Sequence, residues 1–265
     1  MVRWKTGTSQ ANGINIHYLR TGGNKPPVIL LHGLMTSGGC WTPLARTLEE
    51  DYDIFMPDAR GHGSSTVPDR GYRYDILAAD VLGLIEALGL TTPILLGHSM
   101  GGLMASVVAS QNPDLLRGLV LVDPPFLTPK QQHEVYESDV KDQHRQILNR
   151  SMEDYLVELR IRQRNRSPEL IELFAQARFQ TSIHAFEILT PPYPDYRQLI
   201  SSLSIPSLLV IGGVNGIVSS TMAAELVGIN PSLKFIQIEE AGHAIPFDQP
   251  ERFSAAIKAF LSSIA

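Results

Sequence analysis

The chain has 265 residues, of which 43% are hydrophobic, and a formal net charge of −5. This length and composition predict one large domain with a substantial buried core. Acidic and basic residues are mixed along the chain, which argues against a nucleic-acid surface or a basic face for membranes. The single cysteine, Cys40, excludes an intramolecular disulfide framework, and no Cys/His spacing resembles a zinc site.

The first residues, 1–8, lack the apolar core of a signal peptide. No apolar run approaches the roughly 20 residues that span a bilayer. We therefore expect a soluble, cytoplasmic protein that works without a metal or a cofactor and has no nucleic-acid or membrane partner. Nothing in the sequence requires that chains associate.

Short aliphatic runs alternate with longer amphipathic ones along the chain. Residues 14–19 alternate as a half-exposed strand should, and six further runs are typical of buried strands: 28–31, 54–56, 94–96, 119–122, 208–211 and 235–238. Helical spacing is found at 41–48, 74–88, 103–110, 221–227 and 250–261. This alternation predicts an α/β fold in which a mostly parallel, twisted sheet is flanked by helices.

The alternation stops between residues 124 and 203, in a segment that is polar, charged and helix-prone. We interpret this segment as a helical cap inserted into a core domain made of residues 1–123 and 204–265. Four of its arginines are interpreted as a solvated face, because alternate residues on a helix do not share one side: Arg160, Arg162, Arg164 and Arg166. Its aromatic residues provide surface to cover an apolar ligand: Phe126, Tyr136, Phe174, Phe179, Phe186 and Tyr193.

The segment Gly97-His98-Ser99-Met100-Gly101 matches the G-x-S-x-G pattern of a nucleophile elbow. It follows the strand-like run at 94–96 and precedes a helical run, which is the context that such an elbow requires. The serine of an elbow takes a strained backbone conformation, so its near neighbours must be small. Gly97 and Gly101 meet this need. Ser99 is therefore the predicted nucleophile, and His98 is expected to point away from it.

In an open α/β sheet, ligands bind beyond the carboxyl ends of the strands. Acyl transfer needs two backbone N–H groups aimed at the developing oxyanion. We expect Met100, which follows the nucleophile, and Leu34, which follows the strand at 28–31, to supply them. His32, in the same loop, is interpreted as a structural imidazole that bonds loop backbone. His243, on a glycine-containing loop after the last strand, is the predicted base, because a serine hydroxyl needs a neighbouring base to lose its proton.

Taken together, these segments resemble the α/β-hydrolase superfamily over almost the whole chain. The residues that carry the resemblance are His32-Gly33, 58–65, 97–101 and Gly242-His243. The resemblance implies that Asp58 and Arg60 are structural, and we interpret them as a surface ion pair. It also disfavours a dehalogenase or an epoxide hydrolase, which would carry an aspartate where this chain has Ser99.

The chain departs from this superfamily at the acid of the triad. Most relatives place an aspartate after the penultimate strand, where this sequence has Asn215. A neutral amide cannot stabilise an imidazolium, and an aspartate-to-asparagine change in a serine protease costs roughly 10⁴ in turnover. We predict that Asp123 takes this role, because it ends the strand at 119–122, at the same sheet edge as Ser99; certain lactonases of the superfamily take their acid from that strand end. The alternative is an aspartate that caps a helix or bonds a loop.

The predicted activity is hydrolysis of a carboxylic ester or lactone by Ser99, His243 and Asp123. The cap, rather than the sheet, is expected to select a small or medium-sized apolar substrate. A carbon–carbon bond hydrolase, an amidase or a perhydrolase would use the same groups, although the Gly-Pro-Gly element associated with the carbon–carbon class is missing. Outside enzymes, the alternative is a ligand-sensing protein with vestigial turnover, which Asn215 favours.

Overall fold

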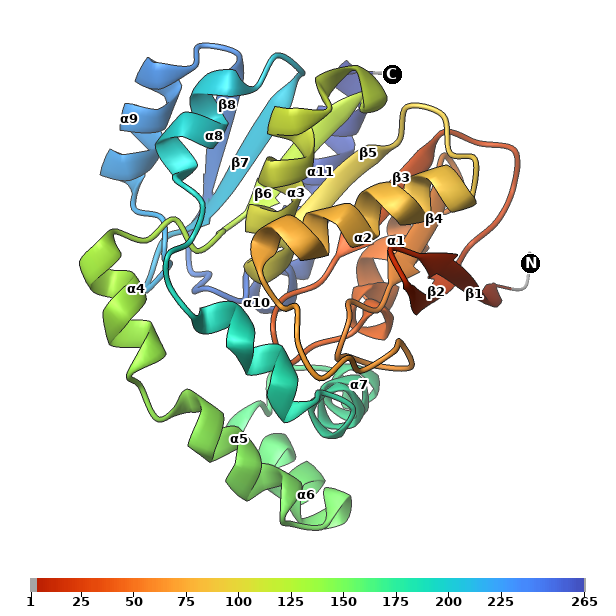
Figure 1. Ribbon diagram of the computed structural model, residues 1–265, viewed down its shortest axis with the longest axis vertical. Helices are drawn as coiled ribbons and strands as arrows, with labels where there is room; N and C mark the ends of the chain where they lie inside the picture. The colour runs from red at the N-terminus through yellow and green to blue at the C-terminus, as the bar shows by residue number, and fades with distance from the viewer. Residues whose placement is uncertain (1–3, 265) are drawn as a thin grey trace.

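The computed structural model describes residues 4–264, which form an eight-stranded sheet with helices on both faces (Figure 1). The strand order is β1-β2-β4-β3-β5-β6-β7-β8; β2 pairs antiparallel with both β1 and β4, and the other pairs are parallel. The predicted α/β class and mostly parallel sheet are therefore confirmed. The strands are β1 (Lys5–Ala11), β2 (Ile14–Arg20), β3 (Pro27–Leu31), β4 (Asp53–Pro57), β5 (Ile94–His98), β6 (Gly118–Val122), β7 (Ser207–Gly212) and β8 (Leu233–Ile238).

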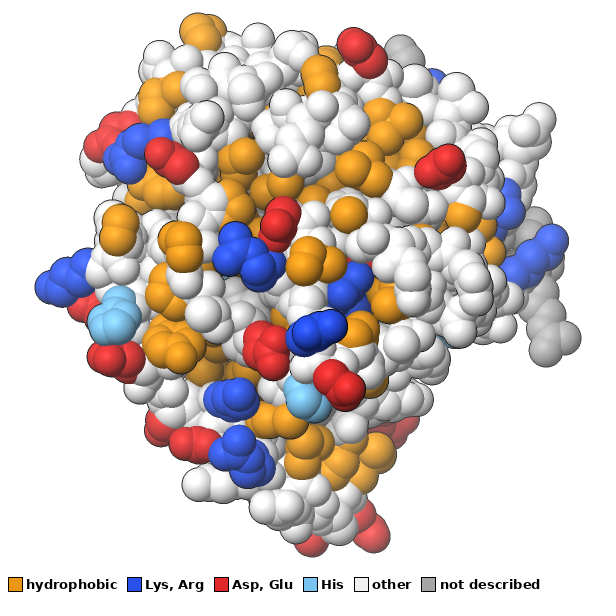
Figure 2. All heavy atoms as spheres, in the orientation of Figure 1, with side chains coloured by type: hydrophobic (Ala, Val, Ile, Leu, Met, Phe, Trp, Pro, Cys, Tyr) orange, Lys and Arg blue, Asp and Glu red, His pale blue; other side chains and the backbone are white. Residues whose placement is uncertain are grey.

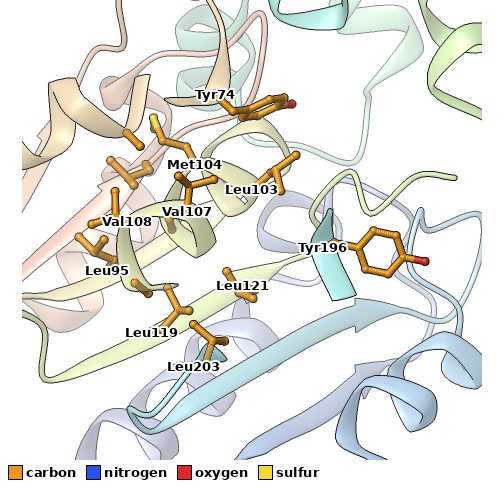
Figure 3. Close-up of a cluster of buried hydrophobic side chains, with 14 of the residues drawn as sticks. Tyr74, Leu95, Leu103, Met104, Val107, Val108, Leu119, Leu121, Tyr196 and Leu203 are labelled. Carbon is orange, nitrogen blue, oxygen red and sulfur yellow. The ribbon is translucent and has the colours of Figure 1, made fainter. Parts of the chain in front are cut away.

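Successive residues of the central strands point to opposite faces of the sheet, and helices bury both faces. Ile29 and Leu31 of β3 pack in a cluster with α2 (Tyr74–Ala87) and α3 (Met100–Gln111). The intervening Val28 and Leu30 pack on the other side with α1 (Thr42–Leu48) and α11 (Pro250–Ser263). In the first cluster, Leu119 and Leu121 of β6 lie against the helix that begins at the elbow (Figure 3). This helix is therefore held firmly on the sheet.

The last strand, β8, differs from its prediction as a buried strand. Its Phe235 and Ile236 are both 38% exposed. The cause is its position, because β8 is the outermost strand of the sheet and pairs only with β7. A hydrophobic run indicates a strand, but it does not indicate whether that strand has a neighbour on each side.

The chain between β6 and β7 is helical, as predicted for residues 124–203. It contains α4 (Pro129–Tyr136), α5 (Val140–Leu148), α6 (Met152–Arg162), α7 (Pro168–Phe179), the 3₁₀ helix η3 (Ile183–Leu189) and α8 (Tyr196–Ser202). In Figure 1, α5 and α6 lie farthest from the sheet, whereas α8 returns to pack on α3. The division into a cap and a core stays a prediction. The remaining helices are η1 (Gly38–Trp41), η2 (Pro113–Leu115), α9 (Ser220–Ile229) and α10 (Ile245–Asp248).

On the face shown in Figure 2, Lys and Arg side chains are interspersed with Asp and Glu. This mixed pattern agrees with the even distribution of charge along the sequence. Within residues 4–264, no helix is long and apolar enough to cross a bilayer.

Candidate active site

Ser99 lies at the turn between β5 and α3, with φ 51° and ψ −120°. Few residues other than glycine adopt a positive φ, and this conformation holds the hydroxyl above the sheet edge. A Cβ on Gly97 would lie 2.1 Å from the carbonyl oxygen of Gly101, and one on Gly101 would lie 2.3 Å from that of Leu31. Both contacts are too short for any side chain. The elbow therefore requires small residues at both positions, as the sequence indicates.

His243 lies between the other two predicted triad residues. Its Nε2 is 3.0 Å from Oγ of Ser99, and its Nδ1 is 2.6 Å from Oδ2 of Asp123. Because a carboxylate only accepts hydrogen bonds, Nδ1 carries the proton toward Asp123. Nε2 is then free to accept the proton of the Ser99 hydroxyl. The structure thus brings together three side chains that are far apart in the sequence.

Asp123 is fully buried directly after β6 and receives two further hydrogen bonds. The backbone N–H groups of Ile217 and Val218 donate to its two oxygens, each at 2.9 Å. These donors come from the loop after β7, the segment in which the resemblance implies an aspartate. Asn215 of that loop is exposed, and its side chain forms no hydrogen bond within the described chain. The loop therefore supports the carboxylate of Asp123 instead of supplying its own.

Strained backbone gathers at this edge of the sheet. Of the seven non-glycine residues with positive φ in the described chain, five follow the carboxyl ends of β3, β5, β6, β7 and β8: Met35, Ser99, Asp123, Asn215 and Glu240. Such conformations cost on the order of 1–3 kcal/mol each and persist only where the surroundings hold them. Their concentration marks the edge where the predicted chemistry lies.

The two predicted oxyanion-hole residues line the same cavity as Ser99. Leu34 and Met100 both line this cavity, and within residues 4–264 neither backbone N–H donates to another group. Met100 is the first residue of α3, so its N–H belongs to the unpaired, positively polarised end of a helix. His32 holds the loop that carries Leu34, since its Nδ1 donates to the Gly33 carbonyl and its Nε2 accepts from the Ala59 N–H. This bonding agrees with the structural role predicted for His32, and burial lowers the pKa of its imidazole.

His98 forms no hydrogen bond with Ser99 in the described chain and instead bonds the loop of the base. Its Nε2 donates to the carbonyl oxygen of His243 at 2.9 Å. Burial lowers the pKa of His98 to about 3, so the ring is neutral at ordinary pH. The sequence placed His98 in the elbow but gave no sign of this contact with the loop of the base.

The prediction that Asp58 and Arg60 form a surface ion pair is wrong. Asp58 is buried and accepts from Nδ1 of His17 at 2.8 Å, while Arg60 is buried and binds Asp80. Proximity in the sequence suggested the pair, but β2 and α2 supply the actual partners. These contacts fix the loop after β4 beneath the site.

A cavity of about 440 Å³ opens over Ser99 and His243. Apart from the sheet edge, its walls come from the segment between β6 and β7, including Tyr155, Phe174 and Tyr193. Most of this wall is apolar. Not all predicted aromatic residues take part, since Tyr136 is 52% exposed and Phe126 stacks on Tyr196.

Two arginines also line this cavity, and neither belongs to a solvated face. Arg166 binds Asp248 at 2.7 Å and lies 5.1 Å from the ring centroid of Phe174. Its assignment to a solvated helix face is wrong because α6 ends at Arg162, which leaves residue 166 in the turn that follows. Arg178, near the end of α7, was not singled out from the sequence. Its Nε is buried without a hydrogen-bond partner in the described chain.

Comparisons with known proteins identify the family of this chain. A protein 34% identical over 263 residues, N-formylmaleamate deformylase of Pseudomonas putida, is matched over 96% of both chains. The crystal structure of an N-formylmaleamic acid deformylase from Pseudomonas putida S16 superposes with a TM-score of 0.82 at 26% identity, covering 96% of this chain and all of that one. An sn-1-specific diacylglycerol lipase of Mus musculus is 28% identical, over 89% of this chain and 81% of the relative. Residues 26–250 match the model of the alpha/beta hydrolase fold family. The chain therefore belongs to the α/β-hydrolase family.

Proposed function

We propose that this protein is a serine hydrolase that cleaves the acyl bond of a small substrate through an acyl-enzyme. The observation that carries the proposal is the hydrogen-bonded series from Ser99 through His243 to Asp123, at 3.0 Å and 2.6 Å. A nucleophile within reach of a base that a third group orients is the arrangement needed for covalent catalysis. The apolar cavity over Ser99 has room for a small molecule.

In the proposed mechanism, Oγ of Ser99 attacks the substrate carbonyl while Nε2 of His243 takes its proton. The Leu34 and Met100 N–H groups stabilise the resulting oxyanion. His243 then donates that proton to the leaving oxygen or nitrogen, which departs and leaves an acyl-serine. Water attacks the acyl-serine, again losing a proton to His243, and release of the acid restores Ser99. Asp123 holds the imidazole in the required tautomer and stabilises its charged form.

The first candidate bond is that of a carboxylic ester or lactone. The similarity to a diacylglycerol lipase supports this class, as does the mostly apolar wall of the cavity. Its leaving group is an alkoxide, which a single protonated imidazole can neutralise as it departs.

A second candidate is the C–N bond of an N-acyl compound. It is favoured by a specific observation, the 34% identity to an N-formylmaleamate deformylase over nearly the full length of both chains. The catalytic groups are the same, and only the atom that receives the proton from His243 differs.

The test uses matched 4-nitrophenyl esters and 4-nitroanilides of the same short acyl groups. We expect repeated turnover of at least one series, and we expect Ser99→Ala to lower kcat by about 10⁵-fold or more. Ser110→Ala, on the same helix, serves as a control because its hydroxyl only bonds the Val107 carbonyl. If these compounds acylate Ser99 only once and are not turned over, the result would instead indicate a ligand-sensing protein. Full activity of Ser99→Ala would contradict the proposal.

A further inference from the structure

Arg178 carries a positive charge that no other described residue balances. No ion pair within residues 4–264 includes it, and its Nε is buried without a hydrogen-bond partner. Its Nη1 contacts the thioether sulfur of Met35, which is a weak acceptor. Burial lowers the pKa of Arg178, and the nearby Tyr155 opposes this shift only in part. The guanidinium is therefore only partly exposed and has no anionic partner within residues 4–264.

Arg166, the other arginine of the cavity, has an anionic partner within the protein. Arg166 binds the carboxylate of Asp248 and lies over the ring of Phe174. Its charge is therefore neutralised without a ligand. Arg178 is therefore the arginine of this mostly apolar cavity that has no anionic partner in the described chain.

We propose that Arg178 binds a carboxylate of the substrate, so that the natural substrate is a small acyl compound with an apolar body and one anionic end. The inference rests on the proposed function and names its substrate class. A planar guanidinium matches a carboxylate through two parallel N–H···O bonds. One arginine balances the single charge of a carboxylate, whereas a phosphate monoester carries up to twice that charge.

The position of Arg178 sets where this carboxylate lies relative to the reacting bond. Its guanidinium contacts Met35, the residue directly after Leu34, whose N–H is a proposed oxyanion donor. Since Arg178, Leu34 and Ser99 line one cavity, we expect the bound anion to lie only a few bonds from the scissile carbonyl. The carboxylate also replaces the thioether of Met35 with a stronger acceptor.

A purely structural role explains these contacts less well. Arg178 is in the last turn of α7, where a positive charge interacts favourably with the helix dipole. An exposed arginine would gain the same interaction without losing its hydration. The dipole therefore accounts for the charge but not for its burial in the cavity beside Ser99 and His243.

The experiment compares 4-nitrophenyl hydrogen glutarate with its methyl-capped form, each corrected for uncatalysed hydrolysis. The two esters share the acyl chain and leaving group and differ only at the far end, which carries a charge in one and a neutral methyl ester in the other. We expect the protein to favour the acid, and we expect Arg178→Met to lower the ratio of the two kcat/KM values by about 10- to 150-fold, mainly through KM. Arg178→Lys keeps the charge but loses the planar fork, so its ratio falls to an intermediate value.

Arg164→Met is the matched control, since it removes the same charge from an exposed position outside this cavity. We expect this control to keep the ratio of the original protein. No preference for the acid, or an equal loss on both esters in Arg178→Met, overturns the inference. Ser99-dependent turnover of the capped ester reports on the proposed function separately, so the two failures are distinguishable.

A thermal-shift measurement separates binding from structure. Without ligand, we expect Arg178→Met to unfold at a Tm no lower than that of the original protein, because it loses a partly buried charge that has no anionic partner in the described chain. Glutarate should raise the Tm of Ser99→Ala but not of the double variant Ser99→Ala/Arg178→Met. A Tm several degrees lower for Arg178→Met, with the glutarate shift retained, would assign the arginine a structural role.

Discussion

The cavity has two ends: the sheet edge, where Ser99 and His243 lie, and the helical end, which is formed by the segment between β6 and β7. They differ in how many of their polar groups form hydrogen bonds within the protein. At the sheet edge, Asp123 accepts three hydrogen bonds and His243 bonds a partner through each ring nitrogen. At the helical end, the Nε of Arg178 is buried without a partner in the described chain. The triad side chains at the sheet edge are therefore paired without a ligand, and only the Leu34 and Met100 N–H groups stay open there, whereas the Arg178 side chain at the helical end is not paired. We infer that the sheet edge determines the reaction and that the segment between β6 and β7 determines the substrate.

The sheet edge and the helical end also differ in backbone strain. The five strained residues lie in the turns and loops after strands, and the hydrogen bonds and packing of the sheet can hold them in place. Helices α5 and α6 lie far from the sheet and pack on α7 instead (Figure 1). Changes at the sheet edge should therefore have larger effects than changes at the helical end.

The largest expected effect concerns the acid. Asp123→Asn should lower kcat by about 10³- to 10⁴-fold, because an amide cannot stabilise the imidazolium and favours the wrong tautomer. Steady-state kinetics with the best 4-nitrophenyl ester measure this loss. Asn215→Gly is the control and should keep nearly full activity, since that side chain bonds nothing in the described chain and glycine also adopts the positive φ of this position. The reverse result would move the role of the acid to the loop after β7.

Close packing at the sheet edge should make its glycines irreplaceable. Gly101→Ala places a Cβ 2.3 Å from the Leu31 carbonyl oxygen, and we expect a loss of about 3 kcal/mol or more in the free energy of unfolding. Urea denaturation measures it. Gly228→Ala, on the exposed side of α9 with open space around its Cα, should instead stabilise by about 0.5–1 kcal/mol. Equal effects of the two substitutions would mean that the edge can relax around an added methyl group.

The sequence indicated which residues lie at the sheet edge because those signals are local. Ser99 lies in a five-residue motif, and Asp123 and His243 follow strands whose carboxyl ends must share one edge. Arg178 gave no such signal, because its importance depends on how α7 packs over the loop after β3. The partners of Asp58 were missed for the same physical reason, since they come from elements distant in the sequence. Sequence patterns thus predict elements and their ends, but not which helix turns a side chain toward a cavity.

Buried histidines should make the fold sensitive to acid. The pKa values of His62 and His98 are lowered to about 3 by burial, whereas an unfolded histidine has a pKa near 6.5. Below pH 6.5 the unfolded chain therefore binds protons that the folded chain does not. Stability should fall as the pH drops, by up to about 1.4 kcal/mol per pH unit for each histidine. His17 acts in the opposite direction, because its hydrogen bond to Asp58 raises its pKa and stabilises the fold most at low pH.

Urea denaturation at pH 7, 6 and 5 checks this dependence. His62→Gln should reduce the slope of stability against pH by up to about 1.4 kcal/mol per unit. His133→Gln is the control, since that imidazole is exposed on α4 and should leave the slope unchanged. The same slope in all three proteins would mean that His62 does not remain neutral in the fold.

The smallest expected effect is at the apolar wall of the helical end. Phe174 packs edge-to-face on Phe247 at 4.8 Å between ring centroids and lies beneath Arg166. Phe174→Leu keeps an apolar wall but removes these ring contacts, each of which contributes about 0.5–1.5 kcal/mol. We expect kcat for the capped glutarate ester to be nearly unchanged and KM to rise by about 3- to 10-fold. A change in kcat rather than KM would mean that the helical wall also positions the reacting groups. This result would contradict the inference that the sheet edge determines the reaction and the segment between β6 and β7 determines the substrate.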